Sequence, residues 1–153
     1  MMRDSETRQA LATQLDKPLR RRATAVVWRG SDVLLLRASA SFYDVGDLRN
    51  FGLPGGGIEA DELPKDTIVR ELHEETELVA TETQYLFNYF EDWSEDEKES
   101  ADESDYRGQD HHVFWVEAKG EVVLAPEIAD HVWWNKGSEV PVGRHVRPIL
   151  DRL

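Results

Sequence analysis

The sequence contains no cysteine, which excludes a disulfide framework and any mechanism that uses a thiolate. It also has no long apolar run. The longest unbroken aliphatic stretch is Val33 to Leu36, far shorter than the roughly 20 residues of a membrane-spanning helix. The first 22 residues are charged and lack the apolar segment of a signal peptide. We therefore expect a protein of the reducing cytoplasm that does not bind membranes.

Positive charge is scarce. The 18 lysines and arginines are outnumbered by 31 aspartates and glutamates, which gives a net charge of −13. Nonspecific binding to nucleic acid or to an anionic membrane needs a basic surface, so neither is expected. A small anionic substrate held through a metal ion remains compatible with this charge. The 153 residues show no repeat or linker and predict one domain, residues 1–153.

The most informative stretch runs from Leu53 to Leu78 and joins three glycines to an amphipathic segment. Pro64 suits the first turn of a helix, and we expect the helix to end near Glu77. At about 100° per residue its side chains form three arcs, which we expect to face a core, water and a site. In that order the arcs contain Ile68, Leu72, Thr76 and Val69; Asp66, His73 and Glu77; and Arg70, Glu71, Glu74 and Glu75.

The third arc places like charges one turn apart, at a cost of about 0.2–0.5 kcal/mol per pair in an isolated helix. A solvated surface tolerates that cost, so the arc alone is typical of a solubilising face. Three glycines alone indicate only a turn. Together, however, the two halves form a spaced pattern that this composition would produce by chance about once in ten thousand sequences. The pattern is Gly56, five residues, Glu62, seven residues, Arg70, Glu71, Leu72, one residue, Glu74, Glu75, two residues, Leu78.

This stretch resembles the Nudix box, and the chain is similar to Nudix hydrolases. The resemblance implies an α/β fold in which a mixed β-sheet lies between helices, an α/β/α sandwich. It also implies cleavage of a nucleoside diphosphate linked to another group, with Mg²⁺ or Mn²⁺ as cofactor. By position, Glu71, Glu74, Glu75 and the carbonyl of Gly56 would bind the metal. Arg70 would orient a carboxylate of the site, and Glu74 or Glu75 would polarise the attacking water.

The chemistry supports the same interpretation. A diphosphate is anionic, so an arc of carboxylates repels it unless divalent cations lie between them, and hard cations prefer oxygen ligands. Such a cation spreads charge on phosphoryl oxygens and acidifies a water, while a nearby carboxylate takes the proton. The general base could instead lie outside the box, at Glu127 or Glu117.

Two box positions depart from the family pattern, because Asp61 and Glu77 stand where glycine is usual. They leave two alternatives open. One is a nucleotide-binding or regulatory module without turnover, and the other is an isomerase acting on a non-nucleotide diphosphate. The presence of Arg70 and all four box glutamates favours catalysis.

Substrate-binding residues are harder to predict. Our candidates are Arg37, at the end of a predicted strand, and Phe42, Arg49 and Trp93 in loops, which could contact a phosphate or stack on a base. No further signature separates nucleoside triphosphates, nucleotide sugars, ADP-ribose and dinucleoside polyphosphates. Other residues were interpreted as structural, although some could also contribute to the site. They are Arg20 to Arg22 as a solvated strand entrance rather than a phosphate clamp, Phe51 as a core anchor, His111 and His112 as structural residues, and Trp133 and Trp134 as one core and one base-facing residue.

The rest of the chain predicts strands flanked by helical ends. We expect a helical extension over residues 1–22, which could exchange contacts in a homodimer, and an acidic loop over residues 91–110. We expect a closing helix from Pro141 to Leu153 that is interrupted near Pro148. The predicted strands are Ala23 to Trp28, Val33 to Arg37, Thr83 to Phe90, His112 to Ala118 and a strand at Trp133 and Trp134, with Glu121 to Leu124 as a continuation of the sheet.

Overall fold

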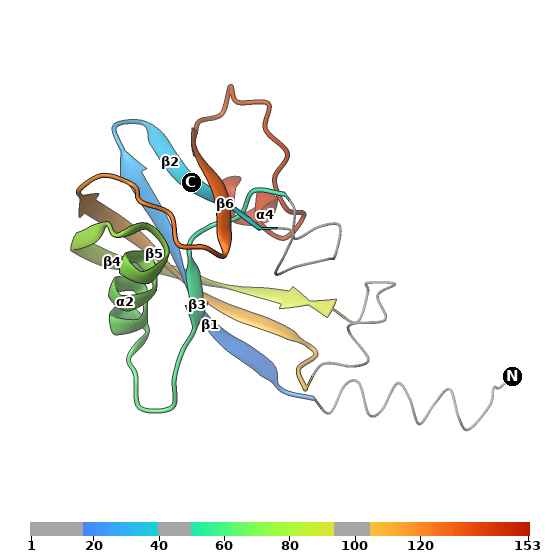
Figure 1. The fold of residues 1–153 in the computed structure, drawn as a ribbon. Coiled ribbons are helices and arrows are strands. Elements are labelled where there is room, and N and C mark those ends of the chain that lie inside the picture. Colours follow the sequence, from blue (N-terminus) through green and yellow to red (C-terminus); the bar gives the residue numbers. More distant parts are fainter. Residues whose placement is uncertain (1–16, 40–49, 94–104) are drawn as a thin grey trace, which may run out of the picture.

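The computed structural model describes residues 17–39, 50–93 and 105–153. Its elements form a twisted sheet with a long helix and a short one (Figure 1). None of the helices in these ranges is long and apolar enough to cross a membrane. In chain order the elements are β1 (Leu19–Arg29), β2 (Asp32–Ala38), β3 (Gly55–Gly57), α2 (Pro64–Thr76), β4 (Val79–Asp92), β5 (Gly108–Lys119), β6 (Ile128–Trp134) and α4 (Arg147–Leu150).

The sheet is mixed, as the sequence predicted. Its order is β4-β5-β1-β2-β6, and β3 pairs with β1 beside this path. β1 and β5 are parallel over ten residue pairs, from Leu19 with Gly108 to Trp28 with Glu117, whereas the other pairings are antiparallel. β1 is therefore the central strand, and its first half carries the glycines of β3 on one edge and β5 on the other.

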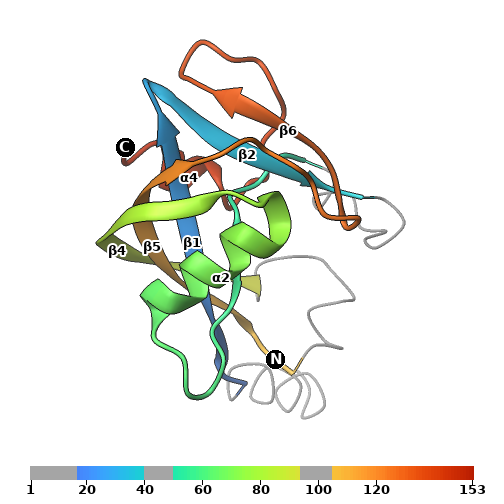
Figure 2. The same cartoon turned by 60° about the vertical axis from the view of Figure 1, so that its left-hand side comes forward.

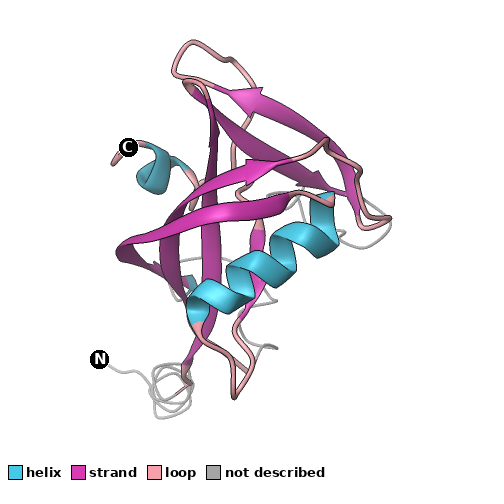
Figure 3. Cartoon of the chain, turned by 90° about the vertical axis from the view of Figure 1, so that its left-hand side faces the viewer, coloured by secondary structure: helices cyan, strands magenta, loops and turns pink. Residues whose placement is uncertain are grey.

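The two faces of the sheet carry separate cores, because successive side chains of a strand point to opposite faces. In β1, Ala25 and Val27 pack with Ile68 and Leu72 of α2. Val26, between them, packs instead with residues of α4. Figures 2 and 3 show the two helices on opposite sides of the sheet. This arrangement confirms the α/β/α sandwich.

Helix α2 has the boundaries that its sequence predicted. It begins at Pro64 and its C-cap is Glu77. Ile68, Leu72 and Thr76 are buried, but Val69, which we placed on the same arc, is 44% exposed. Thr67 is buried in its place. The core-facing arc is therefore rotated by about 100° per residue away from Val69, toward the side that leads to the glycines.

Glu77 ends α2 in the left-handed region, with φ 61° and ψ 6°, and its amide donates to the carbonyl of His73. Among the described residues it is the one non-glycine with positive φ. Replacing Glu77 by glycine should raise the free energy of unfolding by about 1 kcal/mol, because glycine adopts this region without steric cost. The corresponding rise in Tm is about 2–4 °C for a domain of this size.

Glu77→Ala is the matched control for this prediction. Alanine also carries a Cβ and keeps the strain, so a thermal melt of this variant should show no comparable gain. Equal stabilisation by alanine and glycine would mean that the glutamate charge, and not the backbone, is the source of the cost.

Several predicted boundaries were wrong. The expected helical extension includes Leu19 to Arg22, but these residues belong to β1. The acidic loop is shorter than residues 91–110, because β4 continues to Asp92 and β5 starts at Gly108. In both places alternation with neighbouring strands outweighs the local charge.

Near the C-terminus two more expectations were wrong. No strand forms from Glu121 to Leu124. This segment instead follows the end of α2, where the amide of Val123 donates to the carbonyl of Thr76. Pro148 does not interrupt a helix, since it lies in the first turn of α4, where a missing N–H is tolerated.

Candidate active site

The glycines of β3 and the acidic arc of α2 are in direct contact. A Cβ on Gly56 would lie 2.4 Å from the carboxyl carbon of Glu71, so only glycine allows this carboxylate to approach the backbone. The amide of Gly55 donates to Oε1 of Glu75 at 3.0 Å. Gly55 itself has φ 149°, and a Cβ there would lie 2.1 Å from the carbonyl oxygen of Ala23. The glycines therefore bring β3 against β1 on one side and against two box carboxylates on the other.

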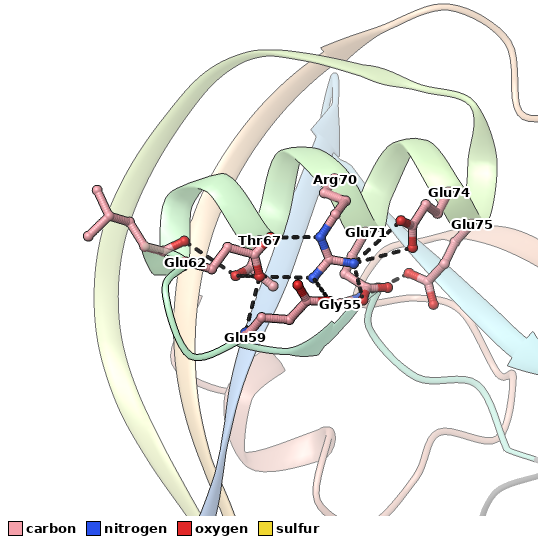
Figure 4. Close-up of polar contacts among 9 residues, drawn as sticks. Gly55, Glu59, Glu62, Thr67, Arg70, Glu71, Glu74 and Glu75 are labelled. Atoms are coloured by element: carbon pink, nitrogen blue, oxygen red, sulfur yellow. Dashed lines mark hydrogen bonds and ion pairs between the residues drawn. The ribbon is translucent and has the colours of Figure 1, made fainter.

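Arg70 lies at the centre of the acidic arc (Figure 4). Its Nε and Nη2 donate to the two oxygens of Glu62 at 2.7 and 2.9 Å, a bidentate pair. Its Nη1 donates to Glu71 at 3.0 Å and more weakly to Glu74 at 3.4 Å. The hydroxyl of Thr67 also donates to Glu62, at 2.8 Å. The bonds from Arg70 and then Thr67 lower the pKa of Glu62 to about 2, so that this carboxylate is a fixed anchor for the arginine.

Glu75 differs from the other box glutamates because it is mostly buried. Burial raises its pKa to about 7, although Arg22 and the Gly55 amide both favour the charged form. Glu71 and Glu127 add to the rise by repulsion. Burial also raises the pKa of Glu71. These two carboxylates would gain from a cation that the protein itself does not supply in full.

The donors in this region suit a hard divalent cation, since all of them are oxygens. The described histidine, aspartate and glutamate side chains contain no group of three already arranged at metal-ligand spacing. Arg70 instead contacts Glu71 and Glu74. A cation at the arc would replace these contacts and would meet the undercompensated charge of Glu75, so the residues fit such an ion once Arg70 withdraws from them.

The acidic arc borders a cavity of about 460 Å³ on the α4 side of the sheet. Glu75 is the box carboxylate that lines it. Apolar residues from β2, from the segment before β3 and from α4 form part of its wall. The polar wall comes mainly from β1, from the end of β4 and from the start of β5. The polar lining residues are Arg20, Arg22, Thr24, Asn50, Glu75, Glu91, Trp93, Gln109, His111 and His145.

A chain of buried hydrogen bonds crosses this wall. The Thr24 hydroxyl lies 2.8 Å from Nδ1 of His111, and Nε2 of His111 lies 2.7 Å from Oε1 of Glu91. A carboxylate only accepts, so the proton of the neutral imidazole is on Nε2, and Nδ1 accepts from Thr24. Burial lowers the pKa of His111, which keeps the ring neutral at pH 7. The indole of Trp93 donates to Oε2 of Glu91 at 2.5 Å.

Glu91 gives this chain a dependence on pH. Burial opposes its ionisation, but hydrogen bonds from His111 and Trp93 outweigh burial and lower its pKa to about 2. Unfolded glutamates titrate near pH 4.3, so the unfolded chain binds this proton more tightly. The stability from Glu91 is therefore present above about pH 4.3 and is lost as the pH falls toward 2, by an amount on the order of 3 kcal/mol.

The lowered pKa of His111 acts in the same direction, since its protonation in the unfolded chain disfavours folding below about pH 6.5. In urea unfolding at pH 7 and pH 3.5, the wild type should lose more stability on acidification than Glu91→Gln, which lacks the titrating carboxylate. Equal losses in both proteins would contradict the lowered pKa of Glu91.

The cavity contains only some of the predicted substrate residues. Trp93 lines it, whereas Arg37 does not. Arg37 donates to Asp130 of β6 at 2.5 Å, and its guanidinium carbon lies 5.2 Å from the ring centroid of Phe51. Phe42 and Arg49 lie outside the described residues.

The other expectations near the site also separate. Phe51 is buried, as predicted, and its edge reaches the cavity. Trp134 is a core residue, while Trp133 packs on the other core beneath Arg29, so neither lines the cavity. Of the two alternative bases, Glu117 is exposed on β5, and Glu127 is near enough to Glu75 to raise its pKa.

Sequence reasoning missed three residues of the cavity wall, namely Arg22, Glu91 and His111. Alternation could have identified two of them. Glu91 shares the face of Phe87 and Tyr89, and Arg22 shares the face of Val26, so extending each period by two or four residues places both on the inner side. For His111, no signal in the sequence distinguished it from His112.

Comparisons with known proteins agree with this geometry. A family model described as NUDIX domain matches residues 18–144. A search of curated proteins gives no match. Among solved structures, the chain is similar to a MutT NUDIX hydrolase from Burkholderia pseudomallei, with a TM-score of 0.72 and 18% identity over 90% of this chain and 99% of that chain.

Two further structures carry bound groups. The NUDIX domain of Shewanella oneidensis NrtR, complexed with ADP ribose, has a TM-score of 0.66 and 19% identity over 99% of this chain and 96% of that chain. A bifunctional NMN adenylyltransferase/ADP ribose pyrophosphatase from Francisella tularensis, complexed with AMP and a Mn ion, has a TM-score of 0.58 and 20% identity. That alignment covers 97% of this chain and 47% of the longer protein. At these identities the similarity concerns the fold.

Proposed function

Because the chain belongs to the Nudix family, we propose that it is a divalent-metal-dependent hydrolase that cleaves the diphosphate linkage of a nucleoside diphosphate derivative. The substrate class comprises nucleoside triphosphates, nucleotide sugars, ADP-ribose and dinucleoside polyphosphates. Water attacks one phosphorus, the bond from that phosphorus to the bridging oxygen breaks, and two phosphorylated products leave.

One observation carries this proposal: a box carboxylate opens onto a cavity of ligand size. Glu75 lines the 460 Å³ cavity, and the same helix presents Glu71 and Glu74 beside it. An acidic solubilising surface has no reason to face a cavity that also contains buried arginine and histidine. A substrate in the cavity would instead place its diphosphate next to the box carboxylates.

The roles of the box residues follow from their contacts. Glu71, Glu74 and Glu75, with the carbonyl of Gly56, would hold Mg²⁺ or Mn²⁺, which when bound spreads charge on the phosphoryl oxygens and acidifies a water. Arg70, anchored by Glu62, orients Glu71.

Glu75 is held in place by the Gly55 amide through one oxygen. The other oxygen is left for a ligand or for the proton of the attacking water. We assign proton acceptance to Glu75 or Glu74, with Glu127 as the candidate outside the box, because Glu127 is close enough to Glu75 to act on its charge.

Product analysis of the purified full chain tests the proposal. The panel contains members of all four substrate classes, including ADP-ribose, each with Mg²⁺, with Mn²⁺ and with chelator. We expect metal-dependent cleavage of one class into a nucleoside monophosphate and a second phosphorylated product or pyrophosphate. Saturable ligand binding without any product would favour the non-catalytic module, and a rearranged non-nucleotide diphosphate would favour an isomerase.

A further inference from the structure

Two arginines on one face of β1 line the cavity wall. Arg20, Arg22 and Thr24 are spaced two residues apart and share that face, whereas Arg21 points to the opposite side and is exposed. The chain has a net charge of −13, so two neighbouring cations in its main cavity are a departure from the general charge of the molecule.

Neither cation has a carboxylate partner. Among the described residues, no carboxylate oxygen forms an ion pair within 4.0 Å of Arg20 or Arg22. Arg20 donates instead to the neutral amide oxygen of Gln109 at 3.2 Å. Charges inside a protein are normally paired, because the loss of hydration is otherwise uncompensated. An unpaired pair of guanidinium groups at a cavity is therefore suited to an anionic ligand.

Arg22 is held by only part of its guanidinium. Its Nε donates to the Thr24 hydroxyl at 3.2 Å, and its Nη2 donates to the carbonyl of Leu53 at 3.0 Å. A guanidinium has five N–H donors, and within the described part of the chain Nη1 has no protein acceptor. Burial lowers the pKa of Arg22, but an arginine remains charged in proteins. The group is thus fixed at one edge and keeps donors for a ligand at the other.

The hydrogen-bond chain described above fixes Arg22 from behind. The Thr24 oxygen accepts from Arg22, so its hydroxyl proton is directed to Nδ1 of His111. His111 is in turn anchored by Glu91, whose second oxygen binds Trp93. None of these residues belongs to the box. Their arrangement explains why a neutral histidine and an ionised glutamate are buried in this wall.

We propose that Arg22, with Arg20 beside it, binds a phosphoryl group in the cavity, and that Thr24, His111 and Glu91 are positioning residues that hold Arg22 for this contact. The planar fork of arginine matches phosphoryl oxygens and forms charge-assisted bonds to them. The inference rests on the proposed function in one respect, namely that the phosphoryl group belongs to the diphosphate substrate. It assigns this group to the wall opposite the box carboxylates.

Phosphate binding in the absence of metal tests the subsite separately from catalysis. The full chain is titrated with inorganic phosphate and with AMP in chelator at constant ionic strength, and the dissociation constant is taken from NMR shifts, including that of the Trp93 indole N–H. Arg22→Gln should weaken binding of at least one ligand about 10-fold or more, because a bond to a charged group contributes roughly 1.5–3 kcal/mol. Dependence with AMP alone assigns the nucleoside-side phosphoryl group, and dependence with both ligands assigns a site for phosphate itself.

The controls separate position from charge. Arg21→Gln removes the same charge from the opposite face of β1 and should leave both dissociation constants unchanged. Arg22→Lys keeps the charge but loses the fork, and should weaken binding less than glutamine does; it also replaces Arg22→Gln if that variant fails to fold. Thr24→Val should weaken binding several-fold without removing any charge.

Equal effects of Arg21→Gln and Arg22→Gln, or no binding of either ligand by the wild type, would overturn the inference. The result does not depend on turnover. Metal-dependent hydrolysis with phosphate binding that ignores Arg22 would leave the proposed function standing without the subsite. Phosphate binding that depends on Arg22, with no hydrolysis of any substrate, would do the reverse.

Discussion

Glu75→Gln is expected to lower kcat for metal-dependent hydrolysis by about 10²–10⁴-fold, the range typical for the loss of a positioned proton acceptor. Glutamine keeps the size of the side chain, and its carbonyl oxygen can still accept from the Gly55 amide. Only the negative charge is lost. Glu75 is the box carboxylate that lines the cavity, so its charge should matter more than that of Glu74, whose side chain is 54% exposed.

Steady-state kinetics over a range of Mg²⁺ concentrations measure this effect, with Glu74→Gln in parallel. Asp66→Asn is the matched control, because Asp66 is an exposed acid on the water-facing side of the same helix. It should retain wild-type kcat. If metal-dependent activity survived both Glu74→Gln and Glu75→Gln, the assignment of these carboxylates to metal binding and proton transfer would be wrong.

Arg70→Lys should give the second large effect, a loss of about 10–100-fold in kcat/KM, which is typical for partners that orient metal ligands. Lysine keeps the positive charge, but it cannot form the bidentate pair with Glu62 and reach Glu71 at the same time. The Mg²⁺ concentration needed for half-maximal activity should rise with it, because Glu71 is no longer held in place.

Two glutamates that contact Arg70 provide the comparison. Glu62→Gln removes the anchor and should reproduce the loss seen with Arg70→Lys. Glu59 lies 3.7 Å from Arg70 and its side chain is 68% exposed, so Glu59→Gln should change kcat/KM little. A similar loss in both glutamine variants would show that the total negative charge near Arg70, and not the bidentate geometry, supports activity.

The box could be predicted from the sequence because its constraints are local. Pro64 at the start of α2, the amphipathic arcs and the glycine-to-glutamate spacing all lie within one short stretch, where helical periodicity translates directly into position. The left-handed conformation of Glu77 was also foreseeable, since a position where glycine is usual indicates a positive φ. For the same reason the family resemblance is concentrated there.

The opposite wall of the cavity could not be predicted in the same way, because its parts are distant in the chain. His111 and Thr24 are 87 residues apart and meet only because β5 lies parallel to β1. Arg22 and Glu91 stand in strongly charged stretches, where composition favours a solvated surface. Alternation along β1 and β4 contradicts that interpretation, but it becomes decisive only when the register between strands is known.

The hydrolysis of the cleaved substrate in H₂¹⁸O, followed by mass spectrometry of both products, tests the central claim most directly. Attack of water on one phosphorus predicts a single ¹⁸O atom in one phosphorylated product and none in the other, with metal present and not with chelator. Products without ¹⁸O, or a rearranged substrate of unchanged mass, would contradict hydrolysis of the diphosphate by this site.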